Sequence, residues 1–356
     1  MVDSLHAVES RIFRSRDFAL DGGAVLPELR IAYETYGELG GAGTNAVLLT
    51  HGYTSHHHQT GRYRKGHAPP GLDENAIGTW EGLVGPGRAI DTGRLFVVSS
   101  NMLGSSYGST CPSHVDPRTG KPYGPNFPRF TVADIVRAQK LLLDHLGVRH
   151  LVAVAGPSYG GYQAFQWAVQ YPDFMHGIVP TVTSPKSNAG PGPTQKLIAD
   201  LATDPNWNGG DYYDNGGIFD TMVTMRVQTL RFYGIEAQLA PTMPDATQRE
   251  AAIRRLAESW ARVFDANAMV VLRRALEGFD TTAQFHRIRA KVLYVLSRTD
   301  KLFPPSLAPG VLQLLDRARV DARYLELDSE FGHLATGVDA DKWAPVLAGF
   351  MAELQR

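Results

Sequence analysis

The sequence predicts an α/β fold in which a mostly parallel central sheet is covered by helices on both faces and carries a helical insertion. Three observations predict this class. Short apolar runs rich in β-branched residues recur through the first half of the chain and near its end. Segments with helical spacing lie between several of these runs. The strand pattern stops from about residue 184 to residue 282 and resumes at Lys291. Strands that alternate with helices form parallel sheets buried on both faces.

The core elements follow in chain order. Residues 27–36 alternate Leu29, Ile31 and Tyr33 with polar neighbours, which predicts a half-exposed antiparallel edge strand. A helix is predicted over residues 131–146, where apolar side chains recur with the 3.6-residue period. The other strands are continuous short apolar runs, as expected for strands buried on both faces. These runs are residues 46–49, 95–98, 151–154, 178–182, 292–296 and 324–327.

The insertion is predicted to be a cap. Its amphipathic pieces are separated by segments rich in glycine, proline and asparagine, and no strand pattern occurs among them. We therefore assign residues 1–183 and 286–356 to an α/β core domain and residues 184–285 to a helical cap inserted into it. Such a cap commonly covers an active site. The expected cap helices are residues 194–203, 221–233, 246–264 and 268–276.

Composition excludes several classes of partner. The chain has 356 residues, and its 35 basic and 36 acidic residues balance, so it offers no field for nucleic acid or an anionic membrane. The single cysteine, Cys111, allows neither an intramolecular disulfide nor a thiolate metal cluster. Without a signal-like N-terminus or a long apolar run, we expect a soluble, cytoplasmic protein that acts on small molecules.

The stretch A-G-P-S-Y-G-G, residues 155–161, predicts a nucleophilic serine. In G-x-S-x-G between a strand and a helix, the chain turns so sharply that only small neighbours fit, and the serine hydroxyl is exposed above the strand ends. Gly156 and Gly160 supply that space for Ser158, and the helix that follows favours negative charge at the same point. The alternative is a structural turn without chemistry.

A serine hydroxyl needs a base and a residue that orients the base, and in this arrangement both follow the serine, in the order acid, then histidine. The strand K-V-L-Y-V-L ends in S-R-T-D, which makes Asp300 the candidate acid. The next strand leads into D-S-E-F-G-H, which makes His333 the candidate base. Asp328 is a rival for the acid, although its place before the histidine in the same loop favours a turn-shaping or solvated role.

Two backbone N–H groups are expected to stabilise the oxyanion that this chemistry produces. One belongs to Tyr159, directly after the nucleophile, and the other to Tyr53 in the loop V-L-L-T-H-G-Y-T-S. Thr54 follows and is an expected substrate contact. The adjacent residues His56–His58 could suggest a metal site, but three consecutive imidazoles do not easily converge on one ion. We expect them to line the loop, and we predict no metal and no cofactor.

Four long blocks of unusual composition occur in the chain: L-V-G-P-G-R-A-I-D-T (83–92), S-N-M-L-G-S-S-Y-G-S-T (100–110), D-P-R-T-G-K-P-Y-G (116–124) and D-P-N-W-N-G-G-D-Y-Y (204–213). With I-A-Y-E-T-Y-G-E-L (31–39), they make nearly the whole chain resemble the homoserine O-acetyltransferase family of α/β-hydrolase-fold enzymes. The resemblance implies the α/β-hydrolase fold and a two-step reaction in which Ser158 takes an acyl group and passes it to an acceptor hydroxyl.

The resemblance also implies substrate contacts and an assembly. In the cap segment T-M-V-T-M-R-V-Q-T-L-R-F-Y, Arg226 and Tyr233 match positions that hold the substrate carboxylate in family members. A guanidinium suits that role because it binds carboxylates with two hydrogen bonds. The alternative for Arg226 is a salt bridge on a helix face. The family further implies a homodimer built through the helical cap, with acetyl-CoA as the usual acyl donor.

Two positions depart from the family pattern. The elbow reads G-P-S-Y-G-G where G-G-S-M-G-G is usual, and G-H-L-A-T replaces G-H-D-A-F, so Leu334 stands where an aspartate faces the ammonium of homoserine. A buried ammonium without a carboxylate partner pays a desolvation cost. We therefore favour a carboxylesterase for short-chain esters over an acetyl-CoA-dependent transferase acting on homoserine or a related alcohol. A noncatalytic binding protein is a third hypothesis.

Overall fold

An eight-stranded sheet forms the centre of the structure, a computed structural model that describes residues 7–187 and 190–356. Its order is β14-β13-β12-β11-β4-β8-β3-β2. The pairs from β14 to β8 are parallel, whereas β3 pairs antiparallel with β8 and with β2. The mostly parallel sheet is therefore confirmed. Its strands are β2 (Arg11–Ala19), β3 (Val25–Tyr36), β4 (Ala46–Leu49), β8 (Phe96–Ser100), β11 (Leu151–Pro157), β12 (Met175–Thr181), β13 (Lys291–Ser297) and β14 (Ala322–Leu327).

The edge of the sheet differs from the prediction. Strand β3 includes the predicted residues 27–36, but it is paired on both sides and is mostly buried, so it is not an edge strand. The edge is β2, whose sequence R-I-F-R-S-R-D-F-A has no clear apolar alternation and buries only Phe18. An edge strand that faces solvent is held by backbone hydrogen bonds to its neighbour. Because these bonds do not require apolar side chains, the sequence of such a strand shows little hydrophobic pattern.

Side chains alternate between the two faces of the sheet. In β4, Ala46 and Leu48 join one hydrophobic cluster, whereas Val47 and Leu49 join the other. This period of two within a continuous apolar run is what a strand buried on both faces requires. The helices that cover the sheet are α1 (Val132–His145), α2 (Tyr159–Gln170) and α8 (Ala308–Arg317) on the first cluster and α10 (Ala340–Leu354) on the second.

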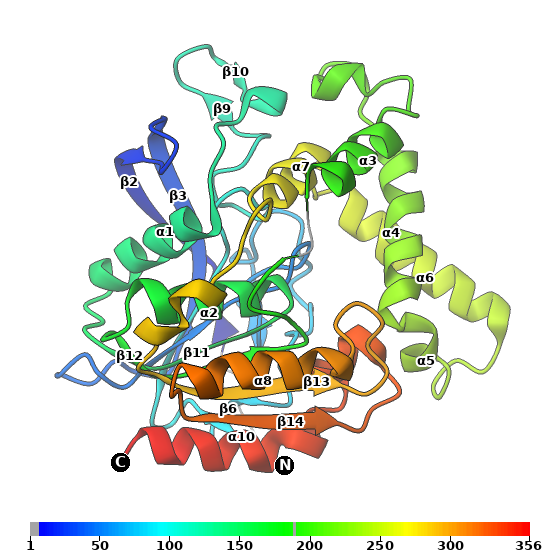
Figure 1. Cartoon of the computed structure of the whole chain (residues 1–356). Helices are drawn as coiled ribbons and strands as arrows, with labels where there is room; N and C mark the ends of the chain where they lie inside the picture. The colour runs from blue at the N-terminus through cyan, green and yellow to red at the C-terminus, as the bar shows by residue number, and fades with distance from the viewer. Residues whose placement is uncertain (1–6, 188–189) are drawn as a thin grey trace.

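The described residues between β12 and β13 form helices joined by turns and loops, with no strand apart from an isolated antiparallel bridge between Lys186 and Asp280. That bridge lies where the chain leaves the core and where it returns. Figure 1 shows α4, α5 and α6 beyond the end of the sheet toward which the arrow of β14 points. The helices are α3 (Pro191–Leu201), α4 (Phe219–Tyr233), α5 (Ile235–Leu239), α6 (Ala246–Ala261) and α7 (Ala266–Arg274). None of the described helices is long and apolar enough to cross a bilayer.

Candidate active site

Ser158 lies at the sharp turn between β11 and α2, in a backbone conformation that a side chain rarely adopts. Its φ is 56° and its ψ is −117°. The end of β12 and the residues that follow it hold this turn. The Ser158 N–H donates to the Thr181 carbonyl at 2.8 Å, and the Thr183 hydroxyl donates to the Ser158 carbonyl at 2.7 Å. Strained backbone persists only where its surroundings fix it, and strain of this kind is concentrated at functional sites.

The two glycines of the motif are required by the end of β4, which packs directly beneath the turn. A Cβ on Gly156 would lie 2.1 Å from the Thr50 hydroxyl oxygen, and a Cβ on Gly160 would lie 2.9 Å from the Thr50 carbonyl oxygen. Thr50 itself donates its hydroxyl hydrogen bonds to the carbonyls of this turn, at Ala155 and Gly160. The expectation that only small neighbours fit beside Ser158 therefore has a specific cause.

His333 and Asp300 form a buried hydrogen-bonded pair. His333 Nδ1 lies 2.8 Å from Asp300 Oδ2, and the Leu302 N–H donates to Asp300 Oδ1 at 2.8 Å. The two side chains are 7% and 1% exposed. The rival acid is elsewhere, because Asp328 is 86% exposed and pairs with Arg298. Asp300 is thus the carboxylate positioned to orient the imidazole.

Aromatic rings fix the plane of the imidazole. The ring of Tyr233, at the end of α4, has its centroid 4.8 Å from that of His333, and Phe303 stacks on His333 at 5.8 Å. His333 and Ser158 line one cavity of about 730 Å³, although no hydrogen bond joins their side chains within the described residues. Catalytic hydrogen bonds are often long without substrate, so the lack of this hydrogen bond does not by itself exclude the pair.

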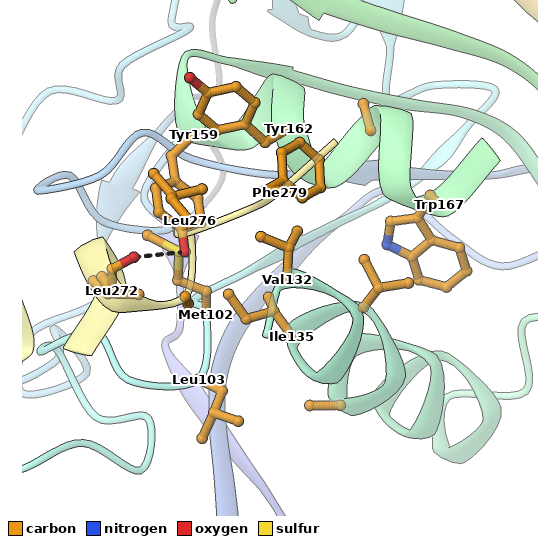
Figure 2. Packing of buried hydrophobic residues seen from close by; sticks show 14 of the residues in the cluster. Met102, Leu103, Val132, Ile135, Tyr159, Tyr162, Trp167, Leu272, Leu276 and Phe279 are labelled. Carbon is orange, nitrogen blue, oxygen red and sulfur yellow. Dashed lines mark hydrogen bonds between the residues drawn. The ribbon is translucent and has the colours of Figure 1, made fainter. Parts of the chain in front are cut away.

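The two candidate oxyanion donors are close to the nucleophile in the structure or in the sequence. Neither the Tyr53 N–H nor the Tyr159 N–H donates to a backbone carbonyl in the described part of the chain. The Tyr53 loop approaches closely, since a Cβ on Gly52 would lie 3.8 Å from Ser158 Cβ. The phenol of Tyr53 donates to the Met269 carbonyl at 2.5 Å, and that of Tyr159 donates to the Leu272 carbonyl at 3.1 Å (Figure 2). Helix α7 therefore anchors both tyrosines and leaves their amides free.

The consecutive histidines divide between two environments, so the loop-lining expectation holds for one of them. His56 lines the cavity. His57 and His58 are instead fully buried around Glu34, which accepts hydrogen bonds from two tyrosine hydroxyls and lies 3.0 Å from His58 Nδ1. Burial lowers the pKa of His56 to about 3. The described residues include no group of three or more potential ligands placed to hold a metal ion.

Arg226 extends from α4 into the cavity. Its Nη1 donates to the Thr54 hydroxyl at 2.8 Å, and its guanidinium lies 4.9 Å above the ring of Trp260. No carboxylate pairs with it within the described residues, and its Nε has no partner. Burial lowers the pKa of Arg226, so the folded protein places this cation in an environment that favours an incoming anion. The alternative of a salt bridge on the helix face is wrong.

Trp260 belongs to the site, although the sequence singled it out only as a tryptophan of the cap and not as a substrate-binding residue. Besides stacking under Arg226, its indole N–H donates to the Thr54 carbonyl at 3.1 Å. Thr54 is thus held through both its backbone and its side chain. The sequence contained a signal in the spacing of α6, where Ile253, Ala257 and Trp260 form one buried face, but that pattern does not distinguish a core residue from a residue of the site.

Leu334 follows the candidate base directly and lines the same cavity. It also packs against a small hydrophobic cluster of the insertion, formed by residues of α4, α5 and α6. The acidic side chain that lines the described part of the cavity is Glu81, and its Oε2 accepts a hydrogen bond from the Gly61 N–H at 3.0 Å. The wall next to the candidate base is therefore apolar.

Comparison with known proteins agrees with this geometry. A profile of the α/β hydrolase fold matches residues 45–336. A homoserine O-acetyltransferase of Haemophilus influenzae is 37% identical over 351 residues, covering 93% of this chain and 95% of that protein. Esterase E22 superposes with a TM-score of 0.86 at 28% identity, over 97% of this chain and all of that one. A homoserine O-acetyltransferase of Bacillus anthracis superposes with a TM-score of 0.84 at 26% identity, over 97% and 98%. Overall shape thus does not distinguish hydrolysis from transfer.

Proposed function

Since the chain belongs to the homoserine O-acetyltransferase family within the α/β-hydrolase fold, we propose that it is an O-acyltransferase that works through an acyl-enzyme on Ser158. The observation that carries the proposal is the buried Asp300–His333 pair beside the strained serine, in one cavity. A hydroxyl becomes a nucleophile only when a positioned base removes its proton. The predicted triad of Ser158, His333 and Asp300 supplies that base and its orientation.

Each step of the acyl transfer can be assigned to a residue of the site. Ser158 Oγ attacks the acyl carbonyl while His333 Nε2 removes its proton, and Asp300 stabilises the imidazolium through Nδ1. The N–H groups of Tyr53 and Tyr159 donate to the oxyanion of the tetrahedral intermediate. His333 returns its proton to the leaving group, which departs and leaves Ser158 acylated. An acceptor hydroxyl, deprotonated by His333, attacks this ester and releases the serine.

The acceptor is proposed to be homoserine or a related hydroxyl compound that carries a carboxylate, with acetyl-CoA as the acyl donor. Two lines of support exist. The relatives that match most of the chain are named for this transfer. The guanidinium of Arg226 has no carboxylate partner within the described residues, lies in the cavity and can hold a carboxylate with two hydrogen bonds, next to Thr54 and Tyr233.

Hydrolysis of short-chain esters is the second candidate function, the one that the sequence favoured. It differs only in the last step, where water removes the acyl group. Leu334 supports it, because an amino acid acceptor would place its ammonium in the cavity without a carboxylate from that position. The similarity to esterase E22 is consistent with it. The family relationship gives transfer the stronger support.

One experiment separates the candidates. The protein is incubated with acetyl-CoA and, separately, with p-nitrophenyl acetate, each with and without homoserine, and the products are identified by mass spectrometry. A transferase forms O-acetylhomoserine, whereas an esterase forms acetate whether or not homoserine is present. Ser158→Ala should reduce either reaction by about a millionfold. Retention of a tenth of the activity by this variant would exclude the acyl-serine mechanism.

Residues 184–285 are proposed to act as the cap of this site, since α4, α6 and α7 contribute Arg226, Trp260 and the carbonyls that hold the two tyrosines. The homodimer through this cap stays a prediction. Light scattering during size-exclusion chromatography at micromolar concentration checks it, and a monomer would contradict it.

A further inference from the structure

Three large apolar side chains surround the mouth of the catalytic cavity and are exposed to solvent. Ile77 is 66% exposed, Leu256 is 47% exposed and Val338 is 37% exposed. All three line the same cavity as Ser158. They come from three separate segments, namely a loop of the core, helix α6 and the short helix α9 (Ala335–Val338). We call these three residues the apolar rim.

The rim is a local concentration rather than scattered exposure. Eleven large apolar side chains of the described residues are exposed, and three of them are gathered at this one opening. Single exposed apolar residues are normal on a protein surface and need no explanation. A contiguous group at the mouth of a cavity is typical of a site that binds an apolar ligand.

The role of His333 as the base indicates which part of a substrate lies near the apolar rim. His333 must give its proton to the oxygen of the leaving alcohol, so that oxygen lies beside the imidazole. The residues that follow His333 run directly into α9. Leu334 and Val338 are four positions apart, which places them on the same helical face, and both line the cavity. An alcohol chain that leaves His333 therefore follows an apolar path to the rim.

The opposite walls of this path contribute Ile77 and Leu256 among polar neighbours, and they lie close to α9. Helix α9 packs against the loop that carries Ile77, since a Cβ on Gly337 would lie 2.5 Å from the Thr79 carbonyl oxygen. Leu256 lies on α6, and its neighbour Ala257 belongs to the cluster on which Leu334 packs. The acidic group of this part of the cavity, Glu81, is hydrogen-bonded to the backbone. The path is thus suited to hydrocarbon.

We infer that the apolar rim binds the alkyl chain of the leaving alcohol when an ester is the acyl donor, so that butyl and hexyl esters are preferred over ethyl esters. This inference rests on the acyl-serine mechanism proposed above. It goes beyond it by naming the class of alcohol and the three residues that select it.

Alkyl acetates test the inference, because ethyl, butyl and hexyl acetate give the same acetyl-enzyme and differ only in the alcohol. A fully buried CH₂ improves kcat/KM by about fourfold, and at a half-open rim by about twofold, so hexyl acetate should exceed ethyl acetate by roughly 16-fold. The ratio should fall below about threefold in the double variant Ile77→Ser/Val338→Ser. Val346→Ser is the matched control, because Val346 is 44% exposed on α10 and lies outside the cavity.

A binding measurement keeps the test independent of turnover. Trp80 and Trp260 line the cavity, so the tryptophan fluorescence of the Ser158→Ala protein reports occupancy by alkyl acetates that it does not consume. Hexyl acetate should bind about tenfold more tightly than ethyl acetate, and the two rim substitutions, made in the same background, should remove this difference.

The outcomes are distinguishable. Ser158-dependent hydrolysis of p-nitrophenyl acetate, together with no dependence on alcohol chain length in either assay, would overturn the inference and leave the proposed function intact. Full activity of Ser158→Ala would instead overturn the proposed function. A chain-length preference that survives in Ile77→Ser/Val338→Ser would place the alcohol elsewhere. A change of oligomeric state in that variant without a change in preference would show that a second copy of the chain covers the rim.

Discussion

Arg226 donates a hydrogen bond from Nη1 to the hydroxyl of Thr54 at 2.8 Å, across the boundary between the helical insertion and the core. The two residues are 172 positions apart. Thr54 directly follows Tyr53, one of the two proposed oxyanion donors. A substrate carboxylate held by the guanidinium would therefore be fixed relative to the reacting carbonyl. Under the proposed function, binding of the acceptor and stabilisation of the transition state would share one short stretch of backbone.

Arg226→Met should reduce acyl transfer to homoserine far more than ester hydrolysis. A charged hydrogen bond contributes about 1.5–3 kcal/mol, so loss of a carboxylate clamp should raise the KM for homoserine by about 100-fold. The partition of acetyl between homoserine and water measures the effect. Arg231→Met is the matched control, because Arg231 lies on the same helix but pairs with Glu236 and Glu250 at the surface. Equal losses in transfer and hydrolysis would show that Arg226 only supports the loop.

Asp300→Asn should give a folded enzyme that is about 10⁴-fold slower. An amide at this position stabilises the wrong tautomer of His333 and cannot balance the charge of the imidazolium. Single-turnover release of p-nitrophenol measures acylation directly. Asp328→Asn is the control, since that carboxylate faces solvent beside Arg298. If Asp328→Asn were slow and Asp300→Asn remained fast, Asp328 and not Asp300 would be the residue that orients His333.

The parts of the site that the sequence predicts share one property, namely that short-range pattern determines them. The turn at Ser158 follows from two glycines between a strand and a helix, and the place of Asp300 follows from the end of an apolar run. The contacts of Glu34 and Trp260 were not predicted because most of their partners are distant in sequence. Glu34 accepts a hydrogen bond from the hydroxyl of Tyr63, 29 positions away. Trp260 donates one to the carbonyl of Thr54, 206 positions away. A buried glutamate in a strand carries no local signal of the groups that satisfy it.

The edge strand β2 was not predicted from the sequence for a related reason. Strand β2 pairs along its length with β3, and this pairing depends on the neighbour rather than on its own side chains. By contrast, the buried parallel strands were predicted because burial on both faces requires continuous apolar sequence. The family-specific blocks supplied the fold where local pattern did not.

Stability should fall steeply in mild acid because buried imidazoles must stay neutral. Burial lowers the pKa of His51 to about 4 and that of His56 to about 3, against 6.5 for an ordinary histidine. His51 Nε2 accepts from the Met102 N–H at 3.3 Å, and protonation there would break this bond. With a lowered folded pKa, the unfolded chain binds more protons between about pH 4 and 6.5. The stabilisation is therefore complete above pH 6.5 and is lost as the pH falls toward 4.

Urea unfolding at pH 7.5, 6 and 5 checks this expectation. His51 alone should contribute about 2 kcal/mol to the difference between pH 7.5 and pH 5, because over roughly 1.5 pH units the unfolded imidazole gains its proton while the folded one stays neutral, at about 1.36 kcal/mol per unit. His51→Gln should show a weaker pH dependence even if it is less stable at pH 7.5. His145→Gln serves as the control, since that side chain is exposed at the end of α1. A flat free energy of unfolding between pH 7.5 and 5 would contradict the argument.

Leu334→Asp should shift the partition of the acyl-enzyme from water toward homoserine. In the wild type, Leu334 presents an apolar wall next to His333, so an acceptor whose carboxylate is held by Arg226 finds no counter-charge for its ammonium at that wall. An aspartate supplies one, and the pairing offsets part of the cost of removing the ammonium from water. A carboxylate beside the imidazole also favours its protonated form and slows the base at neutral pH. We therefore expect slower hydrolysis together with more O-acetylhomoserine per acyl-enzyme, measured by mass spectrometry between pH 6 and 9.

The gain of acetyl transfer in Leu334→Asp should depend on the negative charge of the aspartate and on Arg226, which holds the carboxylate of the acceptor. Leu334→Asn keeps the size of the new side chain and removes its charge. It should therefore lose the same packing on the hydrophobic cluster of α4, α5 and α6 without any gain of acetyl transfer. Leu334→Asp combined with Arg226→Met should also show no gain, because the acceptor would then be held at one end only. If wild type already transfers acetyl from acetyl-CoA to homoserine at every encounter, Leu334 is no obstacle. If the aspartate variant gains nothing at any pH, acceptor choice is controlled elsewhere in the cavity, and Glu81, the other acidic side chain of its wall, becomes the residue to change.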